Sequence, residues 1–176
     1  MVTVHLKNGF NIKRGVNEMT HKKTSFLAAT CLALFFAAMT PSHALTSGNT
    51  IYVPIYSHVY HGNVDWTKKP ESKQMAVMVS VRNTDSKNAI QITSIKYYGS
   101  DGQLIRDETA KAKTLAPMAS MEVFVENKDT TGGAGANYII SFTAKAPVNP
   151  PVIEAVHTNF WAPGSVAFTT RGEIID

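Results

Sequence analysis

The stretch MAVMVSVRNTD, residues 75–85, decides the fold class of this chain. Met75, Val77, Val79 and Val81 share one side of an extended backbone, and the intervening residues point to the other side. A period of two predicts a β-strand with one buried face. The Asn-Thr-Asp-Ser cluster at 83–86 predicts a turn, because short polar side chains bond to the local backbone.

Alternating segments recur outward from this stretch. They predict strands over residues 50–61, 89–98, 104–105, 121–125, 138–144, 152–160 and 166–170. Asp101-Gly102 suits a tight hairpin, and residues 107–113 are expected to form a loop or a single helical turn. Pro54 indicates an edge strand or a bulge, and Pro147, Pro150 and Pro151 are expected to end the strand that begins at 138.

About seven or eight short strands without helical crossovers favour two antiparallel layers. We therefore expect an immunoglobulin-like β-sandwich, with a small β-barrel as the alternative. The cysteine–tryptophan core of antibody domains is absent from the sequence, so only the general architecture is expected.

The N-terminal segment has the pattern of an export signal. Residues 26–39 are apolar, residues 21–23 supply a basic flank, and Ser42-His43-Ala44 offers small residues at the positions that a signal peptidase reads. The run is short for a membrane span, so we expect cleavage between Ala44 and Leu45. An uncleaved anchor and lipid attachment at Cys31 are the alternatives.

Residues 1–18 fit no export signal, and Met19 stands just before the basic flank. This favours Met19 as the true start of translation. The expected organisation is a start-site extension over 1–18, a signal peptide over 19–44, a short linker over 45–49 and one β-domain over 50–176. The expected destination of the mature protein is the periplasm or the medium.

Cleavage changes the charge balance of the chain. Removing 44 of the 176 residues leaves 132, and it removes five of the 17 basic residues and one of the 13 acidic ones. The mature chain then has 12 of each sign, no cysteine and no transmembrane span. Neutral charge gives no support to nucleic-acid binding, and it does not oppose self-association through an edge strand.

Several motifs resemble a family of exported bacterial proteins catalogued as a domain of unknown function. The matching stretches are VSVRNTD (79–85), KYYGSDGQLIRD (96–107), LAPMASMEVFVE (115–126), DTTGGAGAN (129–137), PPVIEAV (150–156) and FTTRG (168–172). The segment 157–165 departs from the pattern. The resemblance implies export and a compact β-domain, and it supplies no activity.

The glycine-rich loop is one candidate binding site. Gly132, Gly133 and Gly135 could turn backbone amides toward an anion, with Asp129 and Asn137 beside them. No Gly-Lys-Ser/Thr sequence follows, so this is not a nucleotide-binding loop. The alternative is a tight connection in which glycine permits a positive φ.

An aromatic stripe is the second candidate. Tyr52, Tyr56 and Tyr60, with His58, fall on the side of the 50–61 strand opposite its apolar residues. Aromatic planes with polar tips suit contacts with proteins or sugars. The alternative is that a neighbouring segment covers them.

Metal and catalytic signals are weak. His58 and His61 lie three residues apart and face opposite sides of a strand, and His157 is a distant third, so no metal or other cofactor is predicted. No G-x-S-x-G motif occurs. Asp129, Glu154, Arg171 and His157 would indicate an enzyme if folding gathered them, although Glu154 and Arg171 could equally form a structural pair.

These observations favour a non-enzymatic exported domain that binds a protein or a glycan. A metal- or anion-binding accessory protein that uses the glycine-rich loop is the alternative. An enzyme with a site assembled only by folding is the weaker alternative.

Overall fold

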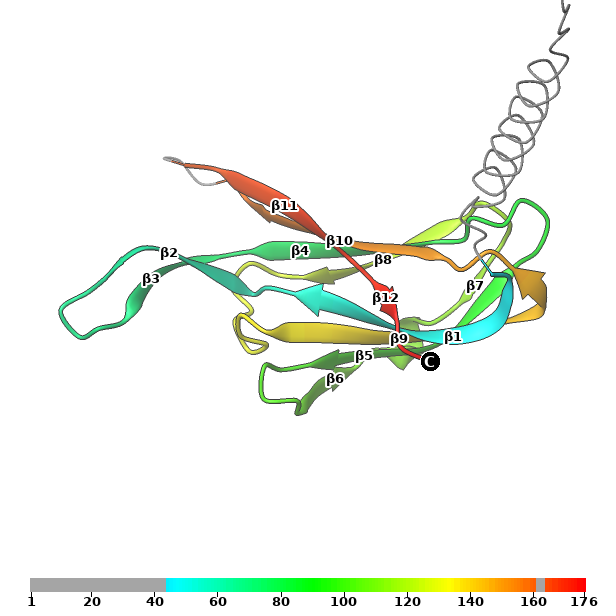
Figure 1. Ribbon diagram of the computed structural model, residues 1–176, viewed down its shortest axis with the longest axis horizontal. Coiled ribbons are helices and arrows are strands. Elements are labelled where there is room, and N and C mark those ends of the chain that lie inside the picture. Colours follow the sequence, from blue (N-terminus) through cyan, green and yellow to red (C-terminus); the bar gives the residue numbers. More distant parts are fainter. Residues whose placement is uncertain (1–43, 161–163) are drawn as a thin grey trace, which may run out of the picture. The chain divides into compact units, whose positions relative to one another are not determined.

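The fold is described from a computed structural model that covers residues 44–160 and 164–176 (Figure 1). The described residues belong to one compact unit. The predicted signal peptide, the predicted Met19 start and Cys31 lie outside the described residues. Within these residues, no helix combines the length and apolar character needed to span a membrane.

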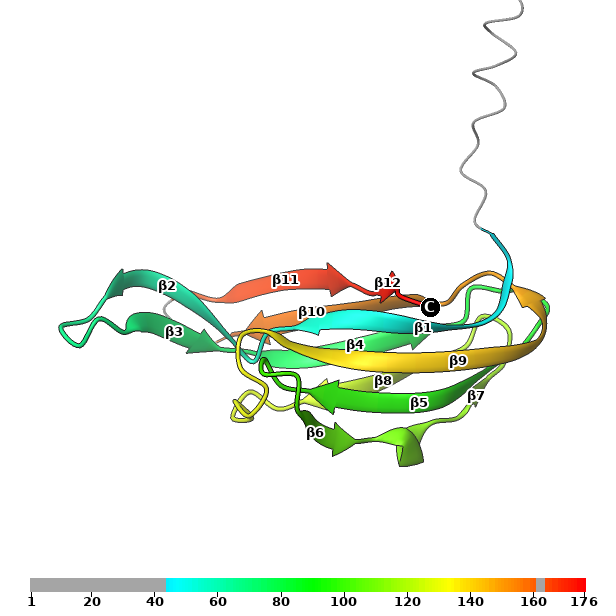
Figure 2. The same cartoon turned by 60° about the horizontal axis from the view of Figure 1, so that its bottom comes forward.

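Three antiparallel sheets make up the described chain (Figure 2). The first has the order β12 (Glu173–Ile174), β1 (Thr46–Ile55), β9 (Ala136–Val148), β5 (Ile90–Tyr98) and β6 (Leu104–Asp107), and β7 (Thr114–Leu115) also pairs with β5. The second has the order β11 (Val166–Arg171), β10 (Val152–Asn159), β4 (Ala76–Arg82) and β8 (Ser120–Val125). The third is a hairpin of β2 (His58–Val64) and β3 (Pro70–Gln74).

One hydrophobic core lies between the first two sheets. Val53 of β1 and Ile140 of β9 belong to the same buried cluster as Val79 of β4 and Val123 of β8. Each strand contributes alternate side chains, so burying one face of each sheet stabilises both layers together. The sheets do not close on each other among the described residues, so the small-barrel alternative is wrong.

The strands with the cleanest alternation form as predicted. The 75–82 segment becomes β4, in which Val77, Val79 and Val81 are buried. The segment around 121–125 becomes β8, with alternate residues buried. The hairpin after β5 also forms, with Gly102 at a φ of 78° and Tyr98 opposite Leu104.

Elements set by distant partners differ from the prediction. The single strand expected over 50–61 is interrupted between β1 and β2 at Tyr56 and Ser57, and β1 already begins at Thr46, inside the expected linker. Pro147 does not end its strand, because β9 continues to Val148. β3, β7 and β12 were not predicted, so the described chain has twelve strands rather than seven or eight. Residues 109–111 form one 3-10 turn, η1 (Thr109–Lys111).

Candidate functional site

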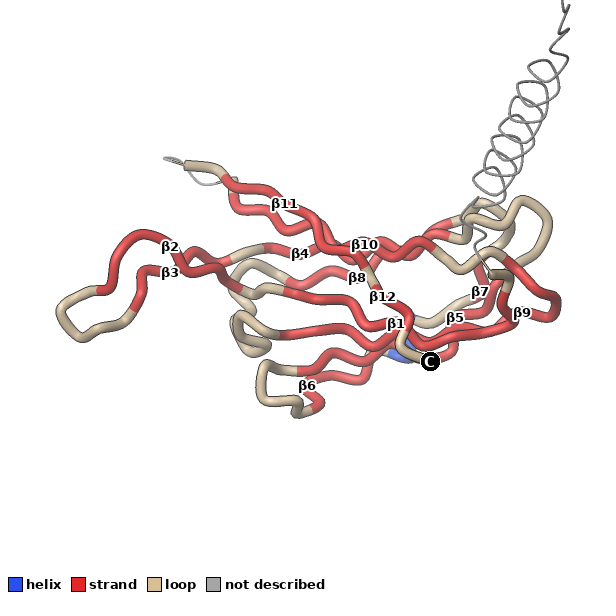
Figure 3. The backbone as a smooth tube through the Cα atoms, viewed as in Figure 1, coloured by secondary structure: helices blue, strands red, loops and turns tan. Residues whose placement is uncertain are grey.

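The β2–β3 hairpin projects beyond the ends of the two larger sheets (Figures 1 and 3). We call residues 58–74 the arm. Ser57 anchors its base: its N–H and its hydroxyl both donate to the Gly133 carbonyl, and its own carbonyl accepts from the N–H of Met75. Ser57 is buried, and these bonds fix the point at which the chain leaves β1 and enters the arm. The arm therefore starts from a fixed point in the sandwich.

The tip of the arm is held in one conformation by Asp65. Its Oδ1 accepts hydrogen bonds from the N–H and the hydroxyl of Thr67, both at 2.7 Å, and from the N–H of Lys69 at 2.9 Å. The hydroxyl bond first, then the backbone bonds, lower the pKa of Asp65. Asp65 and Lys69 also close the loop through their backbones. Short polar side chains commonly order turns in this way.

This ordered tip presents Trp66 to solvent. The residue is 94% exposed, although a tryptophan side chain normally contributes large buried area. Val64, at the end of β2, and Tyr60, further down the same strand, are also exposed. An apolar surface on a protruding and ordered hairpin is typical of a contact site.

A second hairpin lies beside the arm. The Asn159 side-chain amide at the end of β10 donates to the Gln74 carbonyl at 2.7 Å, and Lys73 Nζ donates to the Gly164 carbonyl. Phe160, which follows Asn159, is 73% exposed. We call the exposed arm residues Tyr60, Val64 and Trp66, together with Phe160 near the base of the arm, the arm surface.

The arm surface differs from the predicted tyrosine stripe. Tyr52 stays in β1 opposite Ile139 of β9, and the interruption at Ser57 separates it from Tyr60. Tyr56 packs edge-on against His157 and Phe168, with ring centroids 5.7 and 5.8 Å apart. His58 and Tyr60 do remain together on the arm, with ring centroids 5.1 Å apart.

The histidines lie in different environments. His157 is fully buried, where its ring stacks on Phe168 and its Nε2 accepts from the Tyr56 N–H at 3.1 Å. Burial lowers its pKa to about 4, so it is neutral at pH 7. His61 instead faces Glu71 across the arm at 3.7 Å. Among the residues that the structure describes, no group of three His, Cys, Asp or Glu side chains is placed to hold a metal ion.

The glycine-rich loop uses its polar groups internally. Ser100 Oγ donates to the Gly132 carbonyl and accepts from the Gly135 N–H. The Gly133 N–H donates to the Thr130 carbonyl. Gly133 has a φ of 76°, which favours glycine. This geometry matches the tight-connection alternative: the amides of Gly133 and Gly135 are directed to protein oxygens rather than to a shared anion site. Asn137 lies beyond the loop, in β9 between β1 and β5.

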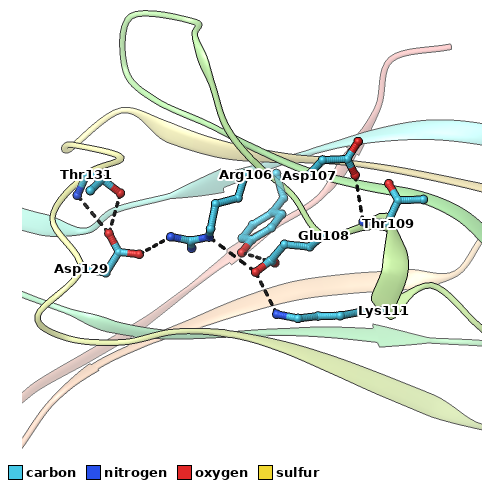
Figure 4. A network of polar contacts seen from close by, with 8 residues as sticks. Arg106, Asp107, Glu108, Thr109, Lys111, Asp129 and Thr131 are labelled. Atoms are coloured by element: carbon cyan, nitrogen blue, oxygen red, sulfur yellow. Dashed lines mark hydrogen bonds and ion pairs between the residues drawn. The ribbon is translucent and has the colours of Figure 1, made fainter.

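Asp129 belongs to a network of charged side chains, drawn in Figure 4. Arg106 of β6 pairs with Asp129 and also lies 3.5 Å from Glu108. Glu108 receives bonds of 2.8 Å from Lys111 and from the Tyr138 hydroxyl. The two positive side chains thus form ion pairs with the two negative ones. These pairs connect β6 and η1 to the β8–β9 loop.

The pKa shifts in this network reflect that pairing. Burial opposes the charge of Asp129, but the hydrogen bonds from Thr131 and Arg106 outweigh it and lower the pKa. Burial, and next the charge of Asp129, raise the pKa of Tyr97 to about 12; its ring lies 4.7 Å below the Arg106 guanidinium. Structural networks of paired charges shift pKa values in this way without requiring a ligand.

Folding does not gather all four residues of the weaker enzyme hypothesis into one site. Asp129 pairs with Arg106, His157 is in the core, and Glu154 Oε2 lies 3.7 Å from Arg82. Arg171 is the cross-strand neighbour of Glu154, yet the ion pair of Glu154 is made with Arg82. A groove of about 670 Å³ beside β1 and β12 is lined by Arg171 but by none of the other three residues.

These features define a class of protein: an all-β protein with two antiparallel sheets over one core and a projecting aromatic hairpin. The chain belongs to the family described as "Protein of unknown function (DUF3124)", whose model matches residues 48–175. This confirms the resemblance drawn from the sequence motifs. No curated protein matches the sequence. Among solved structures, the crystal structure of Thermotoga maritima 1070 is similar at 14% identity, with a TM-score of 0.39, over 71% of this chain and 92% of that one.

Proposed function

We propose that this chain is an exported, non-enzymatic binding domain that contacts a protein or a glycan through the arm surface. The observation that carries the proposal is Trp66, 94% exposed on a loop that Asp65 holds in one conformation. A flexible loop would lose conformational freedom on binding, whereas an ordered one loses less. The arm surface therefore presents aromatic area at a low entropic cost.

The chemistry of the arm surface suits both partner classes. Indole and phenol rings can stack on the apolar faces of sugars or fill pockets on a protein, and aromatic residues are enriched among energetically important contacts. His58 and Tyr60 add polar groups beside the rings. The same features fit the proposed architecture, an immunoglobulin-like sandwich, in which functional loops and hairpins gather at one end.

Photo-crosslinking from the arm tests this proposal. A photoreactive aromatic amino acid replaces Trp66, and the protein is irradiated in its own host. Leu104, 48% exposed on β6, is the matched control position. We expect a discrete crosslinked product from position 66 and none from position 104. Equal labelling at both positions, or none at either, would contradict a protein partner.

A glycan array tests the other partner class. We expect the Trp66→Ala variant to lose array binding while Leu104→Ala keeps it, and both variants to unfold at the same temperature as the parent, because both positions are exposed. The absence of specific glycan binding together with the absence of crosslinks would overturn the proposed function.

Export is the second part of the proposal. It rests on the sequence of residues 19–44, and Leu45, which follows the predicted cleavage point, is exposed. Intact mass spectrometry of the protein from the envelope and culture medium tests it. A mass that begins at Leu45 supports export with cleavage, whereas a protein that retains residues 1–44 would contradict cleavage.

A further inference from the structure

The outer face of the β11–β10–β4–β8 sheet carries an exposed apolar band. In β4, Val77, Val79 and Val81 enter the core, so alternate residues point outward. Among the outward residues, Met78 is 41% exposed, and Phe124 on the neighbouring strand β8 is 55% exposed. The outer face of a sandwich sheet normally carries polar residues. This band therefore calls for an explanation.

The strand register arranges the outward residues in rows across the sheet. One row reads Phe124, Met78, Val156 and Thr169, from β8 to β11. The adjacent row reads Glu122, Ser80, Glu154 and Arg171. A row of three apolar residues, which ends in Thr169, thus runs beside a row that has an acid at its β8 end and a base at its β11 end.

The two end charges have no partner of their own in the described chain. Glu154, inside the charged row, pairs with Arg82. Neither Glu122 nor Arg171 takes part in an ion pair within residues 44–160 and 164–176. Opposite charges stand at opposite ends of one row, which is the arrangement that a two-fold axis makes complementary.

We propose that this outer face binds a second copy of the chain, sheet against sheet, about a two-fold axis that runs along the strands between β4 and β10. Such an axis places β8 of one copy over β11 of the other and keeps each row opposite itself. Glu122 then meets Arg171 of the second copy, twice per dimer, and Met78 meets Val156. Packed sheets cross at about 30°, and the long Glu and Arg side chains can span the resulting offset.

The size of the face predicts a weak dimer. Four strands about 4.8 Å apart, with about six residues each at roughly 3.3 Å per residue, cover roughly 400 Å² of flat area. That is about half of the roughly 800 Å² that each partner buries in a standard specific interface, so the contact has the size of a transient one. We therefore expect reversible dimers that form only at high protein concentration. The arm lies outside this face, so the inference goes beyond the proposed function and does not depend on it.

Sedimentation analysis of the full protein from its host, over a concentration series, tests the inference. Met78→Lys puts a charge in the centre of the band at an exposed position, so the variant should fold and its dimer should weaken by at least tenfold. Leu104→Lys, at a similarly exposed site on β6, is the control and should dimerise like the parent.

A charge swap supplies a sharper test. Arg171→Glu places an acid opposite Glu122 of the second copy, so like charges face each other at both ends of the row. The variant should weaken the dimer roughly tenfold at low salt. Adding Glu122→Arg restores the pairing and should recover most of the loss. The inference is overturned if the parent stays monomeric at millimolar concentration, if Met78→Lys does not weaken the dimer, or if the double variant is no better than Arg171→Glu alone.

Discussion

Acid should destabilise this protein through one buried histidine. His157 is fully buried, and its folded-state pKa is about 4, against an ordinary value of 6.5. Its ring contacts Tyr56 and Phe168, neither of which can compensate a positive charge by ion pairing. Protonation of Nε2 would also remove the acceptor for the Tyr56 N–H. The folded protein therefore excludes a proton that the unfolded chain takes up.

The sign and the size of this loss of stability follow from the linkage between proton binding and folding. Between pH 6.5 and pH 4 the unfolded state binds more protons than the folded state, so stability is complete above pH 6.5 and falls as pH falls. At about 1.36 kcal/mol per pKa unit, the loss approaches roughly 3 kcal/mol near pH 4. Carboxylates such as Asp65 and Asp129 have lowered pKa values, so their contributions persist through this window and decline only at lower pH.

Urea denaturation at several pH values between 7 and 4.5 measures this loss. His157→Phe keeps an aromatic ring against Phe168 but cannot titrate, so its stability should be lower at pH 7 and nearly flat over the window. His61→Gln, on the exposed arm, should retain the slope of the parent. A parent protein without the decline, or a His157→Phe variant that keeps it, would refute the assignment.

Three further substitutions test the packing around the charged network. Gly132→Ala would place a Cβ in steric conflict with the Tyr97 hydroxyl and should destabilise the fold by about 1–3 kcal/mol in thermal unfolding. Gly135→Ala, whose Cβ would lie 3.3 Å from Ser100 Oγ, should cost less. Tyr138→Phe removes the hydroxyl that donates to Glu108 and should cost about 1–3 kcal/mol in urea unfolding; an unchanged midpoint would show that water replaces that bond.

The class of fold was predictable because strand alternation is a local property of the sequence. β4 and β8 show it in consecutive residues, and a sheet that buries one face needs no more than that pattern. The turn at Gly102 was equally local. By contrast, the break at Ser57 depends on Gly133, 76 residues further along the chain, so the 50–61 segment reads as one strand until that partner is known.

The candidate site was predicted only in part. The tyrosine stripe and the proposed arm surface overlap in part, since Tyr60 and His58 of the stripe lie on the arm. Trp66 was missed, because a tryptophan in a sequence gives no sign of its exposure. The Asp-Trp-Thr-Lys-Lys-Pro composition of residues 65–70 was the available signal, since it is typical of a turn that orders its own backbone.

The sequence by itself determined that the described chain is an all-β domain whose strands each bury one face, because side-chain alternation and turn residues act over a few positions. Only the tertiary structure decided which surfaces are left for partners. Pairing across strands placed Arg106 with Asp129 and left Glu122 and Arg171 at opposite ends of one row. Such pairings join residues far apart in the chain, and no local pattern of residues encodes them.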